Sequence, residues 1–487
     1  MRCRHREAIV LFLLLAAVLS PAGKWWAVAV GVNWGTSSSH PLPPEKVVSG
    51  LLHSNNITNV KLFDADPAVL ESLAGSGINV MVGIPNSMLA PLNSSKKAAA
   101  SWVHDNITRY FPNGGVEGRV RIKYIAVGDE PFLLSYGQQF HPFIIGATIN
   151  VQLALLNANL ADKVKIIVPC SSDVFQSNST LPSTAHFRED LNTTMSQLLS
   201  FLNRHPSPFV IDIHPFQTFQ QNQNLSIDYF LFRSSTHRHG KYTNFLDSTL
   251  DALVSSLTKA GFGDMEIIIG RIGWPTDGSV NATAGFARTF MQGLLEHLKK
   301  KVGTPLRPNR VVSETYVFSL LDEDRRDIAT GNYERHFGIF TFDGQAKYDV
   351  DFGEGSKKLA SAQNVEYLSS RWCVVNNNKE LSNVSVRAMD ACFEADCTAL
   401  SNGGSCSSLA WPTNISYAFN SYYQQHDQGA ESCDFDGLGL ITTVDPSVGD
   451  CIFAVQLHTS FAASVLRFRM PLWSATVSSF FLFNLVR

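Results

Sequence analysis

Short apolar runs rich in β-branched residues alternate with longer helical stretches from residue 27 to residue 319. Runs of this length indicate strands, and helices between them are typical of strands that pair in parallel. The predicted strands are residues 27–34, 59–63, 78–83, 122–127, 165–169, 209–213, 266–272 and 313–319. The predicted helical stretches include residues 95–110, 143–160, 190–204, 244–261 and 284–301. Eight strand and helix units over about 340 residues predict the α/β class and one (β/α)8 TIM barrel.

Two smaller doubly wound domains are the alternative to a single barrel. Two such domains would be separated by a linker, and a nucleotide-binding one would carry a glycine-rich phosphate loop after a strand. This region contains neither a Pro/Gly/Ser-rich linker nor such a loop. We therefore favour one barrel over residues 23–353.

Polar residues follow the apolar run at three predicted strand ends. They are Gly128 to Pro131 after the fourth strand, His214 to Phe216 after the sixth, and Arg271 to Pro275 at the end of the seventh. Barrel enzymes carry their chemistry at the carboxyl ends of the strands. These three segments are therefore the first candidates for a site.

Cysteine spacing indicates a second, smaller domain. Of the eight cysteines, Cys3 and Cys170 stand alone, and the other six are Cys373, Cys392, Cys397, Cys406, Cys433 and Cys451. Six closely spaced cysteines predict a disulfide-rich domain, here residues 372–455, after a polar linker at 354–371. They allow 15 pairings, and only the short step from Cys392 to Cys397 suggests a local bridge.

Both ends of the chain carry targeting patterns. In residues 1–22, three arginines precede an apolar run from Ile9 to Leu19, which predicts a signal peptide. A transmembrane anchor is the alternative, but the run is about half of the roughly 20 residues that a spanning helix needs. In residues 456–487, small residues, a short spacer and an apolar tail follow the layout of a GPI-anchor signal. Polar residues interrupt that tail, so a packed or disordered terminus is the alternative.

Surface chemistry agrees with export. Nine glycosylation sequons occur, at Asn56, Asn93, Asn106, Asn178, Asn192, Asn224, Asn281, Asn383 and Asn414. The 39 Lys plus Arg nearly balance the 42 Asp plus Glu, and no basic tract is present. Nothing in this charge pattern points to nucleic acid as a partner.

Six motifs in unbroken order identify a family. They are Gly31 to Gly35, Lys61 to Pro67, Val82 to Asn86, Val127 to Glu130, Gly273 to Thr276 and Glu334 to Gly338. Together they resemble the plant endo-1,3-β-glucanases of glycoside hydrolase family seventeen over residues 28–352. The small domain resembles the family forty-three carbohydrate-binding module in Trp372 to Val375, Ala395 to Leu400, Gly404 to Cys406 and Asp445 to Ser447.

The resemblance implies retaining hydrolysis of β-1,3-glucan (callose). That reaction needs a carboxylic acid that protonates the leaving oxygen and a carboxylate nucleophile about 5–5.5 Å away. The family's acid falls on Glu130, for which a solvated loop carboxylate is the alternative reading. The family's nucleophile falls on Arg271, which cannot lose a proton to attack. A guanidinium beside Glu130 also lowers the pKa that a general acid needs raised.

The resemblance implies further site residues. Asp129 replaces the family's Asn before the acid, and His214 replaces its Tyr after the sixth strand. Glu323 and Glu334 match supporting positions, with Arg325 or Arg326 near a usual lysine. Glu314 and Glu266 are less favoured stand-ins for the nucleophile. The remaining substrate-binding candidates are Asn33, Trp274 and Tyr316, with Trp34 and Phe318 as further aromatic candidates for the cleft.

Two main hypotheses follow. The first is an endo-1,3-β-glucanase with Glu130 as acid/base, and the second is a glucan-binding protein with a catalytically impaired barrel. Arg271 favours the second. A structural wall protein without glucan affinity is a third reading. We expect a monomer without cofactor or metal, located in the cell wall or on the outer face of the plasma membrane.

Overall fold

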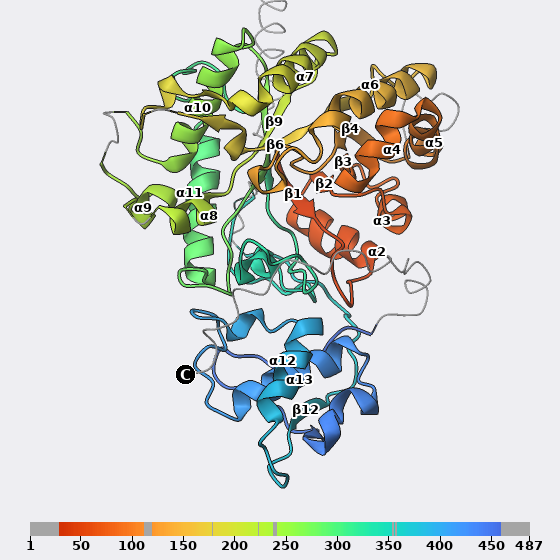
Figure 1. Ribbon diagram of the computed structural model, residues 1–487, viewed down its shortest axis with the longest axis vertical. Coiled ribbons are helices and arrows are strands. Elements are labelled where there is room, and N and C mark those ends of the chain that lie inside the picture. Colours follow the sequence, from red (N-terminus) through yellow and green to blue (C-terminus); the bar gives the residue numbers. More distant parts are fainter. Residues whose placement is uncertain are drawn as a thin grey trace, which may run out of the picture.

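A computed structural model describes residues 29–458 except 112–118, 178, 223, 237–240, 353–354 and 356–357. Figure 1 shows a barrel above a smaller domain that is formed by the chain after residue 370. The predicted signal peptide at 1–22 and nearly all of the predicted anchor signal at 456–487 lie outside the described residues. Within the described part of the chain, no helix combines the length and the apolar character that crossing a membrane requires.

One parallel sheet forms the barrel. Its strands are β1 (Ala29–Trp34), β2 (Asn59–Leu62), β3 (Asn79–Ile84), β4 (Arg121–Val127), β5 (Lys165–Ile167), β6 (Pro169–Ser171), β9 (Phe209–Asp212), β10 (Ile267–Ile272) and β11 (Glu314–Val317). Their order is β5-β4-β3-β2-β1-β11-β10-β9-β6. Strands β5 and β6 are consecutive in the chain and separated only by Val168, so this one segment closes the sheet. The predicted barrel of eight strands is therefore confirmed, with its fifth strand split in two.

Helices cover the outside of the barrel (Figure 1). The longer ones are α5 (Lys96–Asn106), α6 (His141–Asn157), α7 (Asn192–Arg204), α10 (Phe245–Lys259) and α11 (Ala284–Lys299). All five predicted helices are present, each ending within four residues of its expected limits. The short helices α2 (Pro44–Lys46), α3 (Pro67–Ser72), α4 (Leu89–Ser94), α8 (Pro215–Gln221) and α9 (Ile227–Phe230) were not predicted, because they span too few residues to show a periodic pattern.

Side-chain caps begin several of these helices. The side chains of Asn244 and Thr283 accept hydrogen bonds from backbone N–H groups in the first turns of α10 and α11. Asp66 does the same for α3, and Ser95 for α5. Such caps satisfy N–H groups that have no partner inside the helix. They fix where each helix begins after its strand, and so fix the loops at the mouth of the barrel.

Strand β10 contains an irregularity that matters for the site. Its register against β9 shifts between Ile269 and Arg271. Ile268 packs in the cluster that fills the barrel interior, and Ile269 packs in the outer core. A β-carbon at Gly270 would lie 2.4 Å from Asp212 Oδ1, so only glycine fits this inward position. Because a bulge breaks the alternation of faces, Arg271 also points into the mouth of the barrel.

The small domain is built around one antiparallel pair and two helices. Strand β12 (Trp372–Val375) pairs with β13 (Gly439–Thr442), and α12 (Val384–Glu394) and α13 (Thr413–Gln425) pack beside them. Its disulfides are Cys373–Cys433, Cys392–Cys397 and Cys406–Cys451. The local bridge suggested by the sequence is therefore confirmed, and Cys170 is a buried free thiol in β6.

The segment predicted as a linker packs on the barrel where it is described. The backbone of Ala360 bonds to the side chain of Asn55 in both directions. Ala362 donates to the carbonyl of Gly344, and the hydroxyl of Tyr367 donates to Asp343. These contacts attach the connection between the domains to the barrel.

Candidate active site

A cleft of about 610 Å³ opens at the carboxyl end of the barrel strands. Its walls come from the segments after β4, β6, β9, β10 and β11. Among its lining residues are Asp129, Glu130, Tyr136, Asp173, His214, Arg271, Phe318, Arg326 and Glu334. All three strand ends singled out in the sequence contribute to this cleft.

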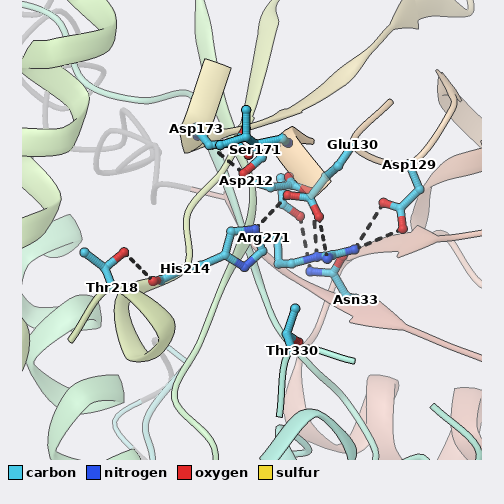
Figure 2. Close-up of polar contacts among 12 residues, drawn as sticks. Asn33, Asp129, Glu130, Ser171, Asp173, Asp212, His214, Thr218, Arg271 and Thr330 are labelled. Atoms are coloured by element: carbon cyan, nitrogen blue, oxygen red, sulfur yellow. Dashed lines mark hydrogen bonds and ion pairs between the residues drawn. The ribbon is translucent and has the colours of Figure 1, made fainter. Parts of the chain in front are cut away.

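Arg271 lies at the centre of the site and is almost fully buried (Figure 2). Its Nη1 donates to Glu130 Oε2 at 3.0 Å, and its Nη2 donates to Asp129 Oδ1 at 3.1 Å. Its Nε lies 3.6 Å from Asp212 Oδ2. The guanidinium also lies against two aromatic rings, 5.1 Å from the centre of Phe63 and 4.8 Å from that of Phe318. Three carboxylates and two rings therefore hold Arg271 in place.

Glu130 is buried beside Arg271 and has a second partner. His214 Nε2 lies 2.7 Å from Glu130 Oε1, so the two carboxylate oxygens are both engaged. The backbone of Glu130 has φ +47°, and that of Gly128 has φ +81°. Such left-handed conformations are costly for a residue other than glycine and concentrate at functional sites. The turn after β4 is thus strained to direct Glu130 into the cleft.

Charge sets the protonation of this group of residues. Burial would raise the pKa of Glu130, but the charges of His214 and Arg271 and the hydrogen bond from His214 outweigh it. The pKa of Glu130 therefore lies well below its ordinary value. Burial would lower the pKa of His214, but the charge and hydrogen bond of Glu130 raise it overall. Glu130 is held ionised, which opposes its use as a general acid.

A buried ion pair next to Arg271 was not predicted from the sequence. Lys61 Nζ lies 3.0 Å from Asp212 Oδ2, and both side chains are almost inaccessible to solvent. Burial raises the pKa of Asp212, while the charges of Lys61 and Arg271 oppose that rise. Both residues lie inside apolar strand runs, which hid them. The signal that could have revealed Asp212 is its place as the last residue of a buried strand.

Three carboxylates meet at this point of the cleft. Oxygen atoms of Asp129, Glu130 and Asp212 lie within 4.8 Å of one another. Oxygen ligands at such spacing suit a divalent cation. Here the guanidinium of Arg271 already pairs with all three carboxylates and supplies the positive charge that they need.

The supporting carboxylates pair with Arg326, which lies over the same two rings as Arg271. Arg326 Nη1 donates to Glu323 Oε2 at 3.3 Å, and its Nε lies 3.5 Å from Glu334 Oε2. Glu323 is buried and also accepts from the backbone N–H of Ser37. Arg326 and Glu334 line the cleft, and Glu323 lies behind them. Of the two arginines expected near this position, Arg326 is the one that enters the site.

Three residues expected to bind substrate lie elsewhere. Asn33 is fully buried, and its amide donates to backbone carbonyls of β10 and β11. Trp274 is buried against Phe216 and Phe290, with its indole N–H on the carbonyl of Asn281. Tyr316 is buried in the barrel interior, with its hydroxyl on Glu314. Figure 2 shows Asn33 beside the guanidinium of Arg271, but neither it nor the two aromatic residues line the cleft. The structure therefore places these three side chains outside the cleft lining, and each of them has at least one hydrogen-bond partner inside the fold.

Neither acidic stand-in for the nucleophile reaches the site. Glu314 begins β11 and accepts hydrogen bonds from Tyr124 and Tyr316, besides its ion pair with Lys123. Glu266 precedes β10, and its carbonyl accepts from Phe209 at the start of β9. Both residues lie at the amino ends of the strands, opposite the cleft.

Comparison with known families agrees with both domains. The model described as glycosyl hydrolases family 17 matches residues 30–352, and the model of the X8 domain matches residues 371–440. The second match confirms the small carbohydrate-binding module predicted for the C-terminal domain.

Individual relatives extend over nearly the whole chain. Glucan endo-1,3-beta-glucosidase 9 of Arabidopsis thaliana is 58% identical, over 93% of this chain and 95% of that protein. Glucan endo-1,3-beta-glucosidase 5 of the same plant is 42% identical, over 92% of each. A solved structure of CJP38, a beta-1,3-glucanase and allergen of Cryptomeria japonica pollen, is 34% identical with a TM-score of 0.63. That match covers 67% of this chain and 100% of the other.

Proposed function

This chain belongs to family 17 of the glycosyl hydrolases, and we propose that its cleft binds β-1,3-glucan while Arg271 suppresses the family's retaining hydrolysis. Relatives named as glucan endo-1,3-beta-glucosidases and the X8 domain support glucan as the ligand. The geometry around Arg271 supports the loss of turnover.

A single observation carries the catalytic part of the proposal. Arg271 occupies the position of the nucleophile and is paired with Glu130, the expected acid, at 3.0 Å. Retaining hydrolysis needs one carboxylate that attacks and one carboxylic acid that gives up a proton. Arg271 cannot attack, and it helps to hold Glu130 in the ionised form. The side chain of Arg271 therefore opposes both the nucleophilic attack and the proton donation that hydrolysis requires.

Sugar binding does not depend on that pair of groups. A saccharide is held by hydrogen bonds to its hydroxyl groups and by aromatic faces. Asp129, His214 and Glu334 line the cleft with polar atoms for such bonds. Tyr136 lines it with a ring that is 40% exposed, and the sequence analysis did not single out this residue. We assign Tyr136 as the stacking face in place of Trp274.

An active endo-1,3-β-glucanase is the second candidate function. Two observations favour it: the printed names of the relatives, and the presence of Glu130 at the end of β4 inside the cleft. In that case another carboxylate of the cleft would have to replace the missing nucleophile. Asp129 and Asp212 are the nearest ones, and both are paired with Arg271.

The two candidates separate in one assay. We expect the purified chain to be retained on insoluble β-1,3-glucan and to release no reducing ends from laminarin. The Asp129→Asn/Arg271→Glu double variant restores the family's residues at both positions, and we expect it to gain measurable release, whereas Arg271→Glu alone crowds four carboxylates together. Wild-type turnover equal to that of an active relative assayed in parallel would overturn the suppression, and lack of retention would overturn glucan binding.

We also propose that the protein acts outside the cell, on the wall or the outer membrane face. Three disulfides support this, because such bonds persist in oxidising compartments. Exposed sequon asparagines at Asn56, Asn192, Asn224 and Asn383 are consistent with glycosylation. Mass spectrometry of the secreted protein before and after glycosidase treatment tests this, and unmodified asparagines together with reduced cysteines would argue against it.

A further inference from the structure

The small domain packs on the loop that follows β10. The backbone N–H of Ser405 donates to Asp277 Oδ1 at 2.7 Å, and its hydroxyl donates to the other carboxylate oxygen at 2.5 Å. A β-carbon at Gly403 would lie 2.4 Å from the backbone nitrogen of Val280. The two domains therefore approach each other at backbone distance here. This is a fitted interface, which a freely tethered module would lack.

The same domain also packs on the loop that follows β11, which is teal in Figure 1 and lies between the barrel and the small domain. Arg335 Nη1 donates to Asp396 Oδ1 at 3.1 Å, and both side chains are mostly buried. His336 Nε2 lies 2.6 Å from Thr398 Oγ1. Asp396 itself is fixed, because its Oδ1 also accepts from the backbone N–H and the hydroxyl of Thr398.

These contacts continue into the wall of the cleft. Arg335 Nε donates to the carbonyl of Arg326 at 3.0 Å, and the carbonyl of Arg335 accepts from the N–H of Glu323. Arg326 in turn reaches Glu334 and packs on the ring of Phe318, both of which line the cleft. One chain of contacts therefore runs from Asp396 in the small domain to the polar wall of the barrel site.

The two loops are also joined to each other. The backbone N–H and the hydroxyl of Thr276 both donate to the carbonyl of His336, each at 2.9 Å. Thr276 is adjacent to Asp277, which Ser405 holds. The small domain thus contacts the loop after β10 and the loop after β11, next to the hydrogen bonds that join these two loops beside the cleft.

We propose that the small domain positions the cleft wall for its saccharide, with Asp396 as a positioning residue that acts through Arg335 and Arg326. The saccharide part of this inference rests on the proposed function. Removing the charge of Asp396 weakens the hold of the small domain on Arg335, which loosens the backbone of Arg326 and the wall that Arg326 forms with Glu334.

The experiment uses the full chain and hydrogen exchange read by mass spectrometry, with laminarihexaose as the probe. Asp396→Asn removes the charge that pairs with Arg335 but keeps an oxygen for Thr398. Asp436→Asn is the matched control, because Asp436 makes an exposed ion pair with Arg387 within the same domain. Arg335→Gln and the Arg335→Gln/Asp396→Asn double variant, measured beside Asp396→Asn, test whether the two residues act as one unit.

In Asp396→Asn we expect faster exchange in residues 323–337, with the barrel strands unchanged. Laminarihexaose should protect the cleft segments 129–136 and 214–218 in the wild type, and its Kd should rise about threefold to tenfold in Asp396→Asn. Asp436→Asn should match the wild type, and the double variant should be no weaker than the weaker single variant.

Unchanged exchange rates at 323–337 in Asp396→Asn would overturn the proposal. Any loss of laminarihexaose affinity would then arise in the small domain itself and not in the cleft wall. Additive losses in the double variant would also overturn it. If the wild type shows no hexaose protection in the cleft, glucan binding by the barrel fails instead, and the exchange rates alone decide whether the small domain supports the wall.

Discussion

The barrel interior holds two buried groups of charged residues, one at each end of the strands. The mouth cluster consists of Arg271 with Asp129, Glu130 and Asp212. The base cluster consists of Glu314 with Lys123, Tyr124 and Tyr316. In the base cluster, neutral hydroxyl groups and one half-exposed lysine satisfy a single carboxylate. In the mouth cluster, one arginine contacts three carboxylates at the edge of an open cleft, and Lys61 and His214 each pair with one of them.

The two clusters also differ in backbone geometry. Around the mouth cluster, Glu130 has a left-handed backbone and β10 is bulged at Gly270. The pairing of β11 with β1 at the base is regular from Glu314 to Val317. Strain of this kind persists where the surroundings enforce it and is common at functional sites. The mouth cluster therefore combines a strained backbone with a buried cation at its centre.

The largest effect should come from removing the cation of the mouth cluster. Arg271→Ala leaves Glu130 with His214 alone, Asp212 with Lys61 alone and Asp129 without its guanidinium partner. Removing one partner of a buried ion pair costs about 3–5 kcal/mol, so we expect a loss of that size in the free energy of unfolding at pH 7. Urea or guanidinium unfolding followed by circular dichroism measures it.

Arg326→Ala is the control for this prediction. Arg326 stacks on the same two rings, Phe63 and Phe318, but it is itself partly exposed, and its buried partner Glu323 keeps a second hydrogen bond from the backbone of Ser37. We expect a loss of about 1 kcal/mol from this change. Equal losses in the two variants would mean that ring stacking, and not charge compensation, fixes Arg271.

A smaller effect should follow from neutralising the base cluster. Glu314→Gln keeps the shape of the side chain and one oxygen that accepts a hydrogen bond from a tyrosine hydroxyl. Its amide NH2 group replaces the second oxygen and cannot accept the other hydrogen bond. A buried polar group with an imperfect partner costs about 1–3 kcal/mol, and we expect about 2 kcal/mol in the free energy of unfolding. Laminarihexaose affinity measured by calorimetry should stay unchanged, because Glu314 lies at the closed end. A weaker affinity would show that the two clusters are coupled.

Sequence reasoning located the mouth cluster better than it described the cleft walls. Glu130, His214 and Arg271 could be predicted because parallel strands of a barrel end at one face. Asp212 and Lys61 could not, because a charged residue within an apolar strand looks like an interruption until its partner is known. Their pairing joins residues far apart in the sequence, which no local pattern reports.

The direction of a side chain near a strand end was also beyond the sequence. Strand alternation assigns faces only while the register is regular, and the bulge at Gly270 shifts every later residue of β10. Trp274 follows this bulge and turns into the outer core against Phe290. The docking of the small domain on the barrel loops likewise depends on contacts between residues that are more than one hundred positions apart in the sequence, such as Asp277 and Ser405.

The smallest expected effect is a pH dependence of the free energy of unfolding that arises from His214 at the mouth cluster. The pKa of His214 is raised in the folded protein, so its stabilising contribution is complete below the unfolded value of about 6.5 and is lost as pH rises through the folded value. The pKa of Glu130 is lowered, so its contribution is present above about 4.3 and is lost as pH falls through the folded value. Their pair should therefore stabilise most between about pH 4.3 and 6.5.

A His214→Gln variant tests this window, since glutamine keeps a donor for Glu130 but carries no charge. We expect the wild type to exceed the variant in free energy of unfolding by about 1 kcal/mol near pH 5.5, and the difference to shrink above pH 7. Glu314→Gln, measured over the same range, shows whether the base cluster shares this dependence. A difference between wild type and His214→Gln that stays constant from pH 5 to 9 would mean that His214 is neutral beside Glu130, and the charges of Arg271 and Lys61 would then hold that carboxylate ionised.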